Sequence, residues 1–449
     1  MSSLDTLLEQ AAQFLREHER VLIVSHADAD GICATTILEE ALDATKIAHE
    51  IVFLNQVSAI ALAKIAKETD GAVVFVDLGA SHLGPIGERF ADRPVLIIDH
   101  HQPHGDAPHA VHCNPVAAGL DGTRVVSAAG LALEIATLLA PDTAVRLSPI
   151  AIIGAQADNQ EQSAFVGINH RILDDAIDAG LVRARVGARL HGIETKNVLD
   201  LVAYSYDLRI EGVTRNREGA RRFLRQIGLH DVERLRYAEL EPDERDLLDR
   251  ELIRRSPNPQ ARVTHYTILD APNGPLRDTR EASTLLNACG RSGKAAVAVR
   301  TLRGDEVALR TALDAQRQYR KAVQEAHRWF QDARAQGDED VIIKSELVLI
   351  RARDRVPPDI AGTLCSVLTK GEEVPRGTVV ICVAHNRDGT GTSKVSSRAV
   401  ESHADLATIM REAAAAVGGE GGGHAVAAGA IIPTDAEEEF LQQLQDSLV

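Results

Sequence analysis

Three continuous apolar runs early in the chain most narrowly constrain how it can fold. They are Val21–Ser25, Ala72–Val76 and Pro94–Ile98, and helical segments separate them. An apolar run without polar alternation is typical of a strand buried on both faces, as in a parallel sheet covered by helices. We interpret Ile150–Gly154 as a further strand of this sheet. The first part of the chain is therefore predicted to be a doubly wound α/β domain.

The sequence pattern changes after this region and again near the end of the chain. In the middle, Leu181–Leu190 and Glu218–Ile227 look like arginine-studded amphipathic helices, and Ala295–Val299 looks like a strand. The last part contains a glycine-rich stretch, Gly418–His424, followed by a terminal helix. We predict three parts: a catalytic α/β domain over residues 1–165, a mixed and largely helical linking region over residues 166–338, and a smaller α/β domain over residues 339–449.

Composition places the chain among soluble globular proteins. Of its 449 residues, 45% are hydrophobic and 25% are charged, close to the averages of that class. No apolar run approaches the roughly 18–20 residues that a membrane span needs. The five cysteines are scattered and form no CxxC pair, which is typical of free thiols in a reducing compartment. We expect a cytoplasmic protein without a membrane partner.

The charge is strongly acidic and unevenly distributed. Lys and Arg number 49 and Asp and Glu 65, a net charge of −16. Such a chain repels nucleic acid unless its charges are segregated or metal ions intervene. Residues 1–165 carry 22 acids and 9 bases, whereas residues 183–262 carry 14 acids and 17 bases, 16 of them Arg. These arginines suit bidentate phosphate contacts, and the alternative is that Arg merely replaces Lys through genome composition.

Acidic and histidine motifs follow each of the predicted strands. They are His26-Ala27-Asp28-Ala29-Asp30-Gly31, Asp77, Asp99-His100-His101 and Asp158. Ligands of an open parallel sheet bind beyond the carboxyl ends of its strands, so these side chains are expected to converge. Clustered carboxylates repel one another, and two divalent cations would relieve that repulsion. The mixture of carboxylate and imidazole groups favours Mn²⁺, with Mg²⁺ as the alternative.

Each motif also has a purely structural interpretation. Asp30-Gly31 could be a turn, Asp77 a helix-entry residue and Asp158 a helix cap. Asp99-His100-His101 is harder to explain in this way, because three adjacent polar residues directly after a buried strand serve no packing purpose. Their joint occurrence at successive predicted strand ends favours the metal site.

The four motifs together resemble the DHH phosphoesterase superfamily. HADADG, VDLG, IDHH and GAQAD are similar to its first to fourth motifs. Gly421-Gly422-Gly423-His424 resembles the GGGH motif of the DHH-associated C-terminal domain, and Ser396-Ser397-Arg398 resembles the substrate-binding segment of the RecJ nucleases. The stretch Leu276–Arg291 is similar to the archaeal RecJ-like proteins, relatives of the replisome factor Cdc45. Within it, Asn287 and Arg291 could contact substrate or cap their helix.

The resemblance implies a role for each matching residue. His26, Asp28 and Asp77 would hold one metal ion, and Asp30, Asp77, His100 and Asp158 the other. Asp99 would orient the histidine ligand, and His101 would face the scissile phosphate. Arg398 would stabilise charge that develops there. The substrate would be bound by Ser396, Ser397, Arg398, Gly421, Gly422, Gly423 and His424.

These observations predict a metal-dependent phosphodiesterase, a RecJ-like exonuclease that hydrolyses single-stranded DNA, RNA or both from an end. Two alternatives are kept. One is the hydrolysis of short oligonucleotides or cyclic dinucleotides. The other is a Cdc45-like replication or repair scaffold with secondary nuclease activity, for which the resemblance implies the GINS complex or a repair factor as partner.

Overall fold

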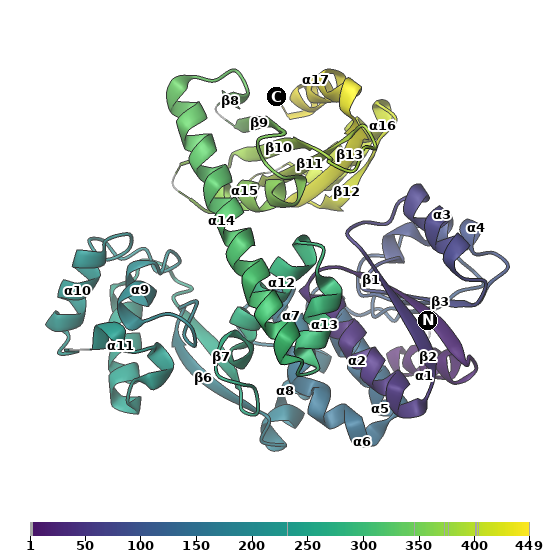
Figure 1. Ribbon diagram of the computed structural model, residues 1–449, viewed down its shortest axis with the longest axis horizontal. Coiled ribbons are helices and arrows are strands. Elements are labelled where there is room, and N and C mark those ends of the chain that lie inside the picture. The colour runs from purple at the N-terminus through teal and green to yellow at the C-terminus, as the bar shows by residue number, and fades with distance from the viewer. Residues whose placement is uncertain are drawn as a thin grey trace. The chain divides into compact units, whose positions relative to one another are not determined.

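The computed structural model describes residues 3–230, 232–344, 346–371, 373–375, 377–399, 402 and 404–448 (Figure 1). It divides into two compact units, Met1–Leu313 and Asp314–Val449. This division by contacts falls inside the long helix α14 (Glu306–Gln336). The three-part division at residues 165/166 and 338/339 stays a prediction.

The first unit is built on a five-stranded parallel sheet in the order β2-β1-β3-β4-β5. Its strands are β1 (Arg20–His26), β2 (Ala48–Leu54), β3 (Ala72–Val76), β4 (Val95–Ile98) and β5 (Val111–Cys113). Strands β3 and β4 are buried along their whole length, as the continuous apolar runs predict. The order reverses direction between β1 and β3, and ligand sites of such sheets lie at this point. The predicted doubly wound α/β fold is confirmed.

Helices cover both faces of this sheet (Figure 1). The helices are α1 (Leu4–Arg16), α2 (Ala29–Thr45), α3 (Ala59–Glu68), α4 (Leu83–Arg89), α5 (Ala128–Leu139) and α6 (Pro141–Ala144). Leu62 of α3 and Ile86 of α4 pack with Phe75 on one face. Helices α1, α2 and α5 contact the sheet on the other face, and α5 also contacts α1 and α2. Burial on both faces explains why β3 and β4 carry no polar residue.

Three predicted elements of the first unit are wrong. Ile150–Gly154 lies in helix α7 (Ser148–Ala157), because a short, wholly apolar run fits a buried helix as well as a strand. Leu181–Leu190 contains strand β6 (Val182–Ala188), which pairs antiparallel with β7 (Arg262–Ile268). Ala295–Val299 lies in helix α13 (Ala295–Leu302), where Ala295, Ala298 and Val299 share a buried face at helical spacing.

The middle of the chain adds helices around the β6–β7 pair. They are α8 (Gly167–Asp178), α9 (Val198–Ala203), α10 (Arg217–Gln226), α11 (Pro242–Arg255) and α12 (Thr279–Arg291). Helix α10 confirms the helix predicted over Glu218–Ile227. Leu199, Phe223 and Leu248 belong to a separate hydrophobic core formed by α9, α10 and α11. This segment therefore has its own packing centre within the first unit.

The C-terminal unit contains a six-stranded sheet in the order β12-β13-β11-β10-β9-β8. Its strands are β8 (Val341–Ile343), β9 (Leu347–Arg353), β10 (Val379–His385), β11 (Thr392–Ala399), β12 (Glu420–His424) and β13 (Ala427–Pro433). Strands β9 and β10 pair in parallel, and the other pairs are antiparallel. The glycine-rich stretch is thus an edge strand of this smaller α/β domain.

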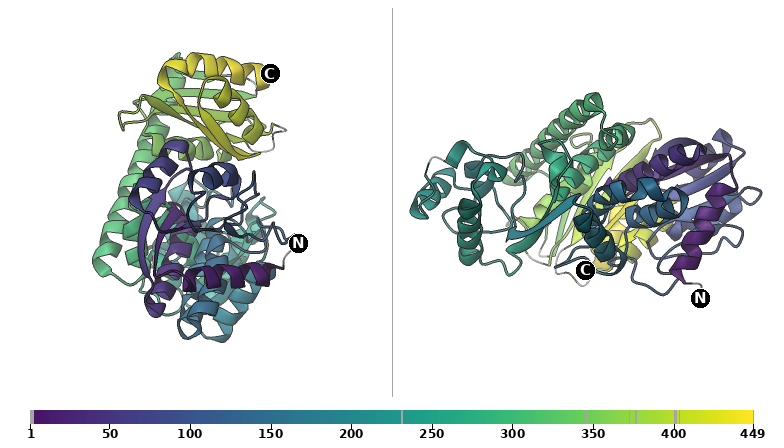
Figure 2. Two further views of the ribbon diagram at one scale, coloured as in Figure 1. Left: turned by 90° about the vertical axis from the view of Figure 1, so that its right-hand side faces the viewer. Right: turned by 90° about the horizontal axis from the view of Figure 1, so that it is seen from below.

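Helices again cover both faces of the second sheet. Helix α15 (Pro358–Lys370) packs on one face together with Phe330 of α14. Helices α16 (Leu406–Ala416) and α17 (Glu437–Leu448) pack on the other. The left view of Figure 2 shows the yellow α17 lying across this face. In the part of the chain that the structure describes, no helix has both the length and the apolar character needed to cross a membrane.

Candidate metal centre

Polar side chains converge at the carboxyl edge of the parallel sheet. His26 is the last residue of β1, Asp77 directly follows β3, and Asp99 begins the polar segment after β4. Asp28 is the N-cap of α2. Asp158 also reaches this edge, but it follows helix α7 rather than the strand predicted before it. The sheet and one helix end therefore bring all four motifs together.

The first group of candidate ligands contains His26, Asp28 and Asp77. The Nδ1 atom of His26 lies 3.0 Å from Oδ2 of Asp28 and 3.4 Å from Oδ2 of Asp77. These three side chains offer ligand atoms close enough together to hold one metal ion. Asp77 is 2% exposed, so its carboxylate has little access to bulk water.

The second group surrounds the other side of the same carboxylate. The Nε2 atom of His100 lies 3.0 Å from Oδ2 of Asp158, 3.4 Å from Oδ1 of Asp77 and 3.8 Å from Oδ2 of Asp30. Asp77 thus presents one oxygen to His26 and the other to His100. The Asp77 carboxylate therefore lies between the two groups of candidate ligands.

Local backbone geometry supports the position of Asp77. Its φ is +58°, a left-handed conformation that is uncommon for a residue with a side chain. Its amide donates a hydrogen bond of 2.9 Å to the carbonyl of Ile98 on the neighbouring strand. Such conformations persist where surrounding structure over-determines them, and they concentrate at functional sites.

Asp30 is fully buried beside the N-terminus of α5. Its carboxylate accepts hydrogen bonds from the amides of Ala128, at 2.8 Å, and Ala129, at 3.0 Å. Gly154 of α7 leaves the room that this carboxylate occupies, because a Cβ there would lie 2.3 Å from Oδ1 of Asp30. Two helices therefore determine where this acid points.

The ring of His100 is oriented by a backbone carbonyl. Its Nδ1 donates a hydrogen bond of 2.7 Å to the oxygen of Gly122, which directs Nε2 toward the carboxylates. Gln160 donates to the same carbonyl at 3.1 Å. This role of Gly122 could not be predicted from the sequence, because only its backbone carbonyl takes part.

Several of these buried atoms have no hydrogen-bond partner among the described residues. They are His26 Nδ1, both carboxylate oxygens of Asp77, and His100 Nε2. Buried polar atoms are nearly always paired, so a cluster of orphans indicates a missing partner. Oxygen and imidazole ligands suit divalent cations such as Mn²⁺. The donor set fits the implied metal ions.

Asp99 lies beside this group but makes different contacts. Its Oδ1 accepts from the His100 amide at 2.8 Å, the His101 amide at 3.1 Å and His101 Nδ1 at 2.7 Å. Its Oδ2 accepts from the Ala80 amide at 2.8 Å. Asp99 thus orients the ring of His101 and the backbone of His100, whereas Gly122 orients the ring of His100.

The pKa values of the carboxylates reflect burial and crowding. Burial raises the pKa of Asp30 well above its usual range, and Asp77 and Asp158 raise it further. Burial and the nearby Asp28 raise the pKa of Asp77 to about 6, although His100 and His26 oppose them. Burial would also raise the pKa of Asp28, but His26, together with hydrogen bonds from Asp77 and the Gly31 amide, lowers that pKa.

The histidines respond to the acids around them. Burial by itself would lower the pKa of both His26 and His100, yet the neighbouring aspartates raise both well above the usual value. Burial also opposes protonation of His101, but Asp99 raises the pKa of His101 to about 9. Without metal ions, protons on the histidines therefore compensate the carboxylates, and metal binding would displace those on His26 and His100.

In the C-terminal unit, polar side chains and glycines share one face of the sheet. Ser396 pairs with Gly429, which pairs with Gly422, and directly paired residues point to the same face. Arg398 lies two residues beyond Ser396 and so shares that face. A Cβ at Gly422 would meet nothing within 4 Å, and a Cβ at Gly362 of α15 would lie 3.4 Å from Ser396 Oγ and 3.3 Å from Arg398 Nη2. Ser396, which is 6% exposed, and Arg398 therefore lie together against Gly362 of α15, and the open backbone of Gly422 lies on the same face two strands away.

Other residues predicted to bind substrate are placed differently. Ser397 is fully buried, and its hydroxyl donates a hydrogen bond of 3.0 Å to the carbonyl of Ala428. Gly421 packs closely on α16. A Cβ at this position would lie 2.3 Å from the carbonyl oxygen of Met410. Gly423 has a φ of +137°. His424 is the last residue of β12, and its side chain lies outside the described residues.

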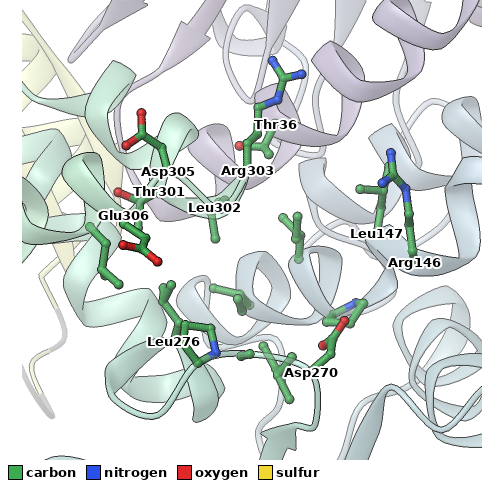
Figure 3. Close-up of a pocket in the computed structure, with 18 of the residues that line it drawn as sticks. Thr36, Arg146, Leu147, Asp270, Leu276, Thr301, Leu302, Arg303, Asp305 and Glu306 are labelled. Carbon is green, nitrogen blue, oxygen red and sulfur yellow. The ribbon is translucent and has the colours of Figure 1, made fainter.

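A cavity of about 680 Å³ lies elsewhere in the first unit (Figure 3). Its walls include Leu276, Leu302 and Arg146. Arg303 at its edge is engaged by Glu39, Glu40 and Asp43. None of the candidate metal ligands lines this cavity. The chemistry of the sheet edge is therefore separate from it.

Comparisons with known protein families agree with this geometry. The N-terminal domain of the DHH family matches residues 20–155, the DHH-CID domain residues 190–264 and the DHHA1 domain residues 344–449. The chain belongs to the DHH superfamily. The match of the first domain covers the strand ends that carry His26, Asp77 and His100.

Similar proteins of known sequence or structure span most of this chain. An uncharacterized protein of Methanocaldococcus jannaschii is 22% identical over 97% of the chain and 94% of its own length. Cdc45 of Entamoeba histolytica superposes with a TM-score of 0.66 at 12% identity, covering 99% of this chain and 98% of its own. RecJ of Thermus thermophilus in complex with Mn²⁺ superposes with a TM-score of 0.57 at 16% identity.

The match to Thermus thermophilus RecJ covers 99% of this chain but only 54% of RecJ, so this chain spans about half the length of that nuclease. The same RecJ has also been solved in complex with Mg²⁺. At these identities the likeness establishes a shared RecJ-like fold.

Proposed function

We propose that this protein is a metal-dependent phosphodiesterase, a RecJ-like exonuclease that hydrolyses single-stranded DNA, RNA or both from an end. The observation that carries the proposal is Asp77, whose two unpartnered oxygens face the unpartnered nitrogens of His26 and His100. A buried carboxylate between two sets of ligands suits a pair of metal ions, and such pairs cleave phosphodiesters by in-line displacement.

The residues divide into two ligand sets that share one acid. His26, Asp28 and Asp77 would hold the first divalent cation, with Mn²⁺ favoured. Asp30, Asp77, His100 and Asp158 would hold the second. When bound, the two ions would supply a nucleophilic water near neutral pH and would neutralise charge on the phosphate oxygens.

His101 is proposed to contact the phosphate. Its side chain is 30% exposed, while Asp99 beside it is buried and accepts a hydrogen bond from Nδ1. This contact orients the ring and favours its protonated form. A positively charged donor placed in advance stabilises the negative charge that develops on the phosphate oxygens.

The C-terminal unit is proposed to grip the substrate. Arg398 would supply a guanidinium on one face of its sheet, with the buried Ser396 beside it and the open backbone of Gly422 on the same face two strands away. Backbone without side chains lets a phosphate or sugar approach closely. We keep Ser397, Gly421, Gly423 and His424 in the proposed substrate segment as the residues that shape it.

A scaffold function is the second candidate. Cdc45 of Entamoeba histolytica matches nearly the whole chain in fold, and residues 190–264 match the DHH-CID domain. These observations favour a role in a replication or repair assembly, with the GINS complex or a repair factor as partner. The complete set of candidate ligands favours catalysis, so we place the scaffold role second, as an addition to turnover.

The test is a digestion of single-stranded DNA and RNA, each labelled at the 5′ or the 3′ end, with Mn²⁺ and then with Mg²⁺. Asp77→Ala is run beside the wild type, and Asp92→Ala serves as the control because Asp92 is an exposed acid of the same unit. We expect nucleotides to be released from one end by the wild type and by Asp92→Ala, and not by Asp77→Ala.

The alternatives give different results in the same assay. Turnover of a linear or cyclic dinucleotide, with both polymers left intact, would move the substrate to the dinucleotide class. Near-normal digestion by Asp77→Ala would contradict the two-ion assignment. Bound Mn²⁺ without turnover of any of these substrates would favour the scaffold.

A further inference from the structure

Helix α12 contacts the loop that carries the first ligands at two points. The side-chain oxygen of Asn287 accepts a hydrogen bond of 3.1 Å from the amide of Ala29. Gly290, one turn further on, faces the carbonyl of Ala27. Both contacted residues lie between His26 and Asp30. Of the two roles considered for Asn287, capping is the one seen, but the helix it caps is α2 rather than its own.

The contact supplies a hydrogen-bond acceptor to an amide at the N-terminus of α2. The first amides of a helix have no partner within it, and a capping side chain satisfies only some of them. Here Asp28, the N-cap, accepts from the amide of Gly31 at 3.1 Å. The amide of the fully buried Ala29 is left over. Because an amide N–H can only donate, the oxygen of Asn287 must face it.

Holding Ala29 also determines where Asp28 points. The Oδ1 atom of Asp28 is engaged by Gly31, so Oδ2 is the atom left for a metal ion, and it lies 3.0 Å from His26 Nδ1. Any shift of the backbone at Ala29 moves Asp28 relative to His26. Ligand geometry must be held within about 0.5 Å for a metal site to function well.

Gly290 makes the approach possible. A Cβ at this position would lie 1.6 Å from the carbonyl oxygen of Ala27 and 2.8 Å from its carbonyl carbon. Any side chain here would therefore separate α12 from the loop. The backbone contact and the Asn287 hydrogen bond act on the same short loop from one helix.

The other end of α12 is anchored, so the helix can serve as a fixed support. Glu281 accepts hydrogen bonds from the amide of Glu194, at 2.7 Å, and from the hydroxyl of Thr195. Arg280 forms a salt bridge with the buried carboxylate of Glu161. These contacts tie α12 to the middle of the chain and to the segment after Asp158.

We propose that Asn287 is a positioning residue of the metal centre: its side-chain oxygen holds the Ala29 amide, with Gly290 setting the distance, so that His26 and Asp28 converge on one metal ion. This inference rests on the proposed metal-dependent function. It assigns Asn287 no contact with substrate.

The test measures Mn²⁺ binding directly, with metal-free full-length protein titrated and free Mn²⁺ followed by electron paramagnetic resonance. Asn287→Leu keeps the size but removes the acceptor, and we expect its affinity for the first ion to fall about 10- to 100-fold, as for other residues that orient ligands. Asn287→Asp keeps an acceptor oxygen and is expected to restore affinity to within a few-fold. Thr284→Val, on the exposed side of the same helix, is the matched control and should bind like the wild type.

If Asn287 had only a structural role, Asn287→Leu would lower the melting temperature of the metal-free protein, but the Mn²⁺ affinities of the three variants would not differ in the expected way. The melting temperature and the Mn²⁺ affinity of each variant are therefore both measured. Asn287→Ala replaces Asn287→Leu if the latter does not fold, and Gly290→Ala should weaken Mn²⁺ binding independently. In the nuclease assay at fixed Mn²⁺, kcat should fall while KM stays near the wild-type value.

Two results would overturn the inference, and they differ in what else they affect. Mn²⁺ binding by Asn287→Leu and Gly290→Ala equal to that of the wild type would refute the positioning role alone. Absence of Mn²⁺ binding by the wild type would refute the proposed metal centre and the positioning role with it.

Discussion

Replacing Glu281 by Gln should stabilise the protein at pH 8. Glu281 is 4% exposed, and burial, with Asp278 and Glu194 nearby, raises its pKa from the usual 4.5 to about 7 despite hydrogen bonds from Thr195 and the Glu194 amide. Between these two pH values the folded chain keeps a proton that the unfolded chain has released. The free energy of unfolding therefore falls as pH rises through this window.

The size of this effect follows from the pKa change. Each pH unit across the window removes up to about 1.36 kcal/mol, so the charged Glu281 costs roughly 3 kcal/mol above pH 7. Gln is neutral at every pH and has the same shape. Its carbonyl oxygen can accept from the Glu194 amide, and its NH₂ group can donate to the Thr195 hydroxyl. We expect Glu281→Gln to match the wild type near pH 4.5 and to exceed it by roughly 3 kcal/mol at pH 8.

The measurement is urea unfolding of metal-free protein followed by circular dichroism from pH 4.5 to pH 8. Glu88→Gln, which changes an exposed acid of α4 in the same unit, is the control and should leave the pH profile unaltered. A stability difference between Glu281→Gln and the wild type that does not grow with pH would refute the reasoning. So would a variant less stable than the wild type at pH 8.

Three further predictions test other parts of the molecule. Gly154→Ala places a Cβ 2.3 Å from the Asp30 carboxylate. It should therefore lower the free energy of unfolding by about 1–3 kcal/mol and weaken Mn²⁺ binding. An unchanged Mn²⁺ titration would show that Asp30 is not a ligand. Phe440→Ala removes a fully buried ring of the C-terminal core and should lower the free energy of unfolding by about 3–5 kcal/mol. The measurement is urea unfolding followed by the fluorescence of Trp329, which lies in the same unit. A loss below 1 kcal/mol would mean that the core is packed differently. Arg398→Gln removes a charged donor and should raise KM for an oligonucleotide about 10- to 100-fold. The Mn²⁺ affinity, measured by titration, should not change. An unaltered KM would show that Arg398 does not bind the substrate.

Much of the site could be predicted because parallel strands end at one edge. Once Val21–Ser25, Ala72–Val76 and Pro94–Ile98 were interpreted as neighbouring strands, the side chains after them had to converge. Strands β1, β3 and β4 bear this out, and they bring together the acids and histidines of three motifs. The prediction required only local pattern and general sheet geometry.

The errors have a common cause, which is that local pattern does not reveal what lies next to a segment. Ile150–Gly154 is apolar because other helices surround α7, and a buried strand would look the same. Leu181–Leu190 contains strand β6 because it pairs with β7, about eighty residues later. Its arginines suggested a helix face, but at period two Arg183 and Arg185 lie on one side of the strand, where Arg183 is exposed and Arg185 pairs with Asp246 and Asp249.

The amino-acid sequence by itself determined the fold class, the motifs and the candidate ligands, because strand burial and ligand chemistry depend on residue type. Only the tertiary structure decided how those ligands are held. The carbonyl of Gly122 orients His100, the amides of α5 hold Asp30, and Asn287 holds the loop before α2. These partners are backbone groups or residues distant along the chain. Their role arises from proximity in space, which no local pattern of side chains encodes.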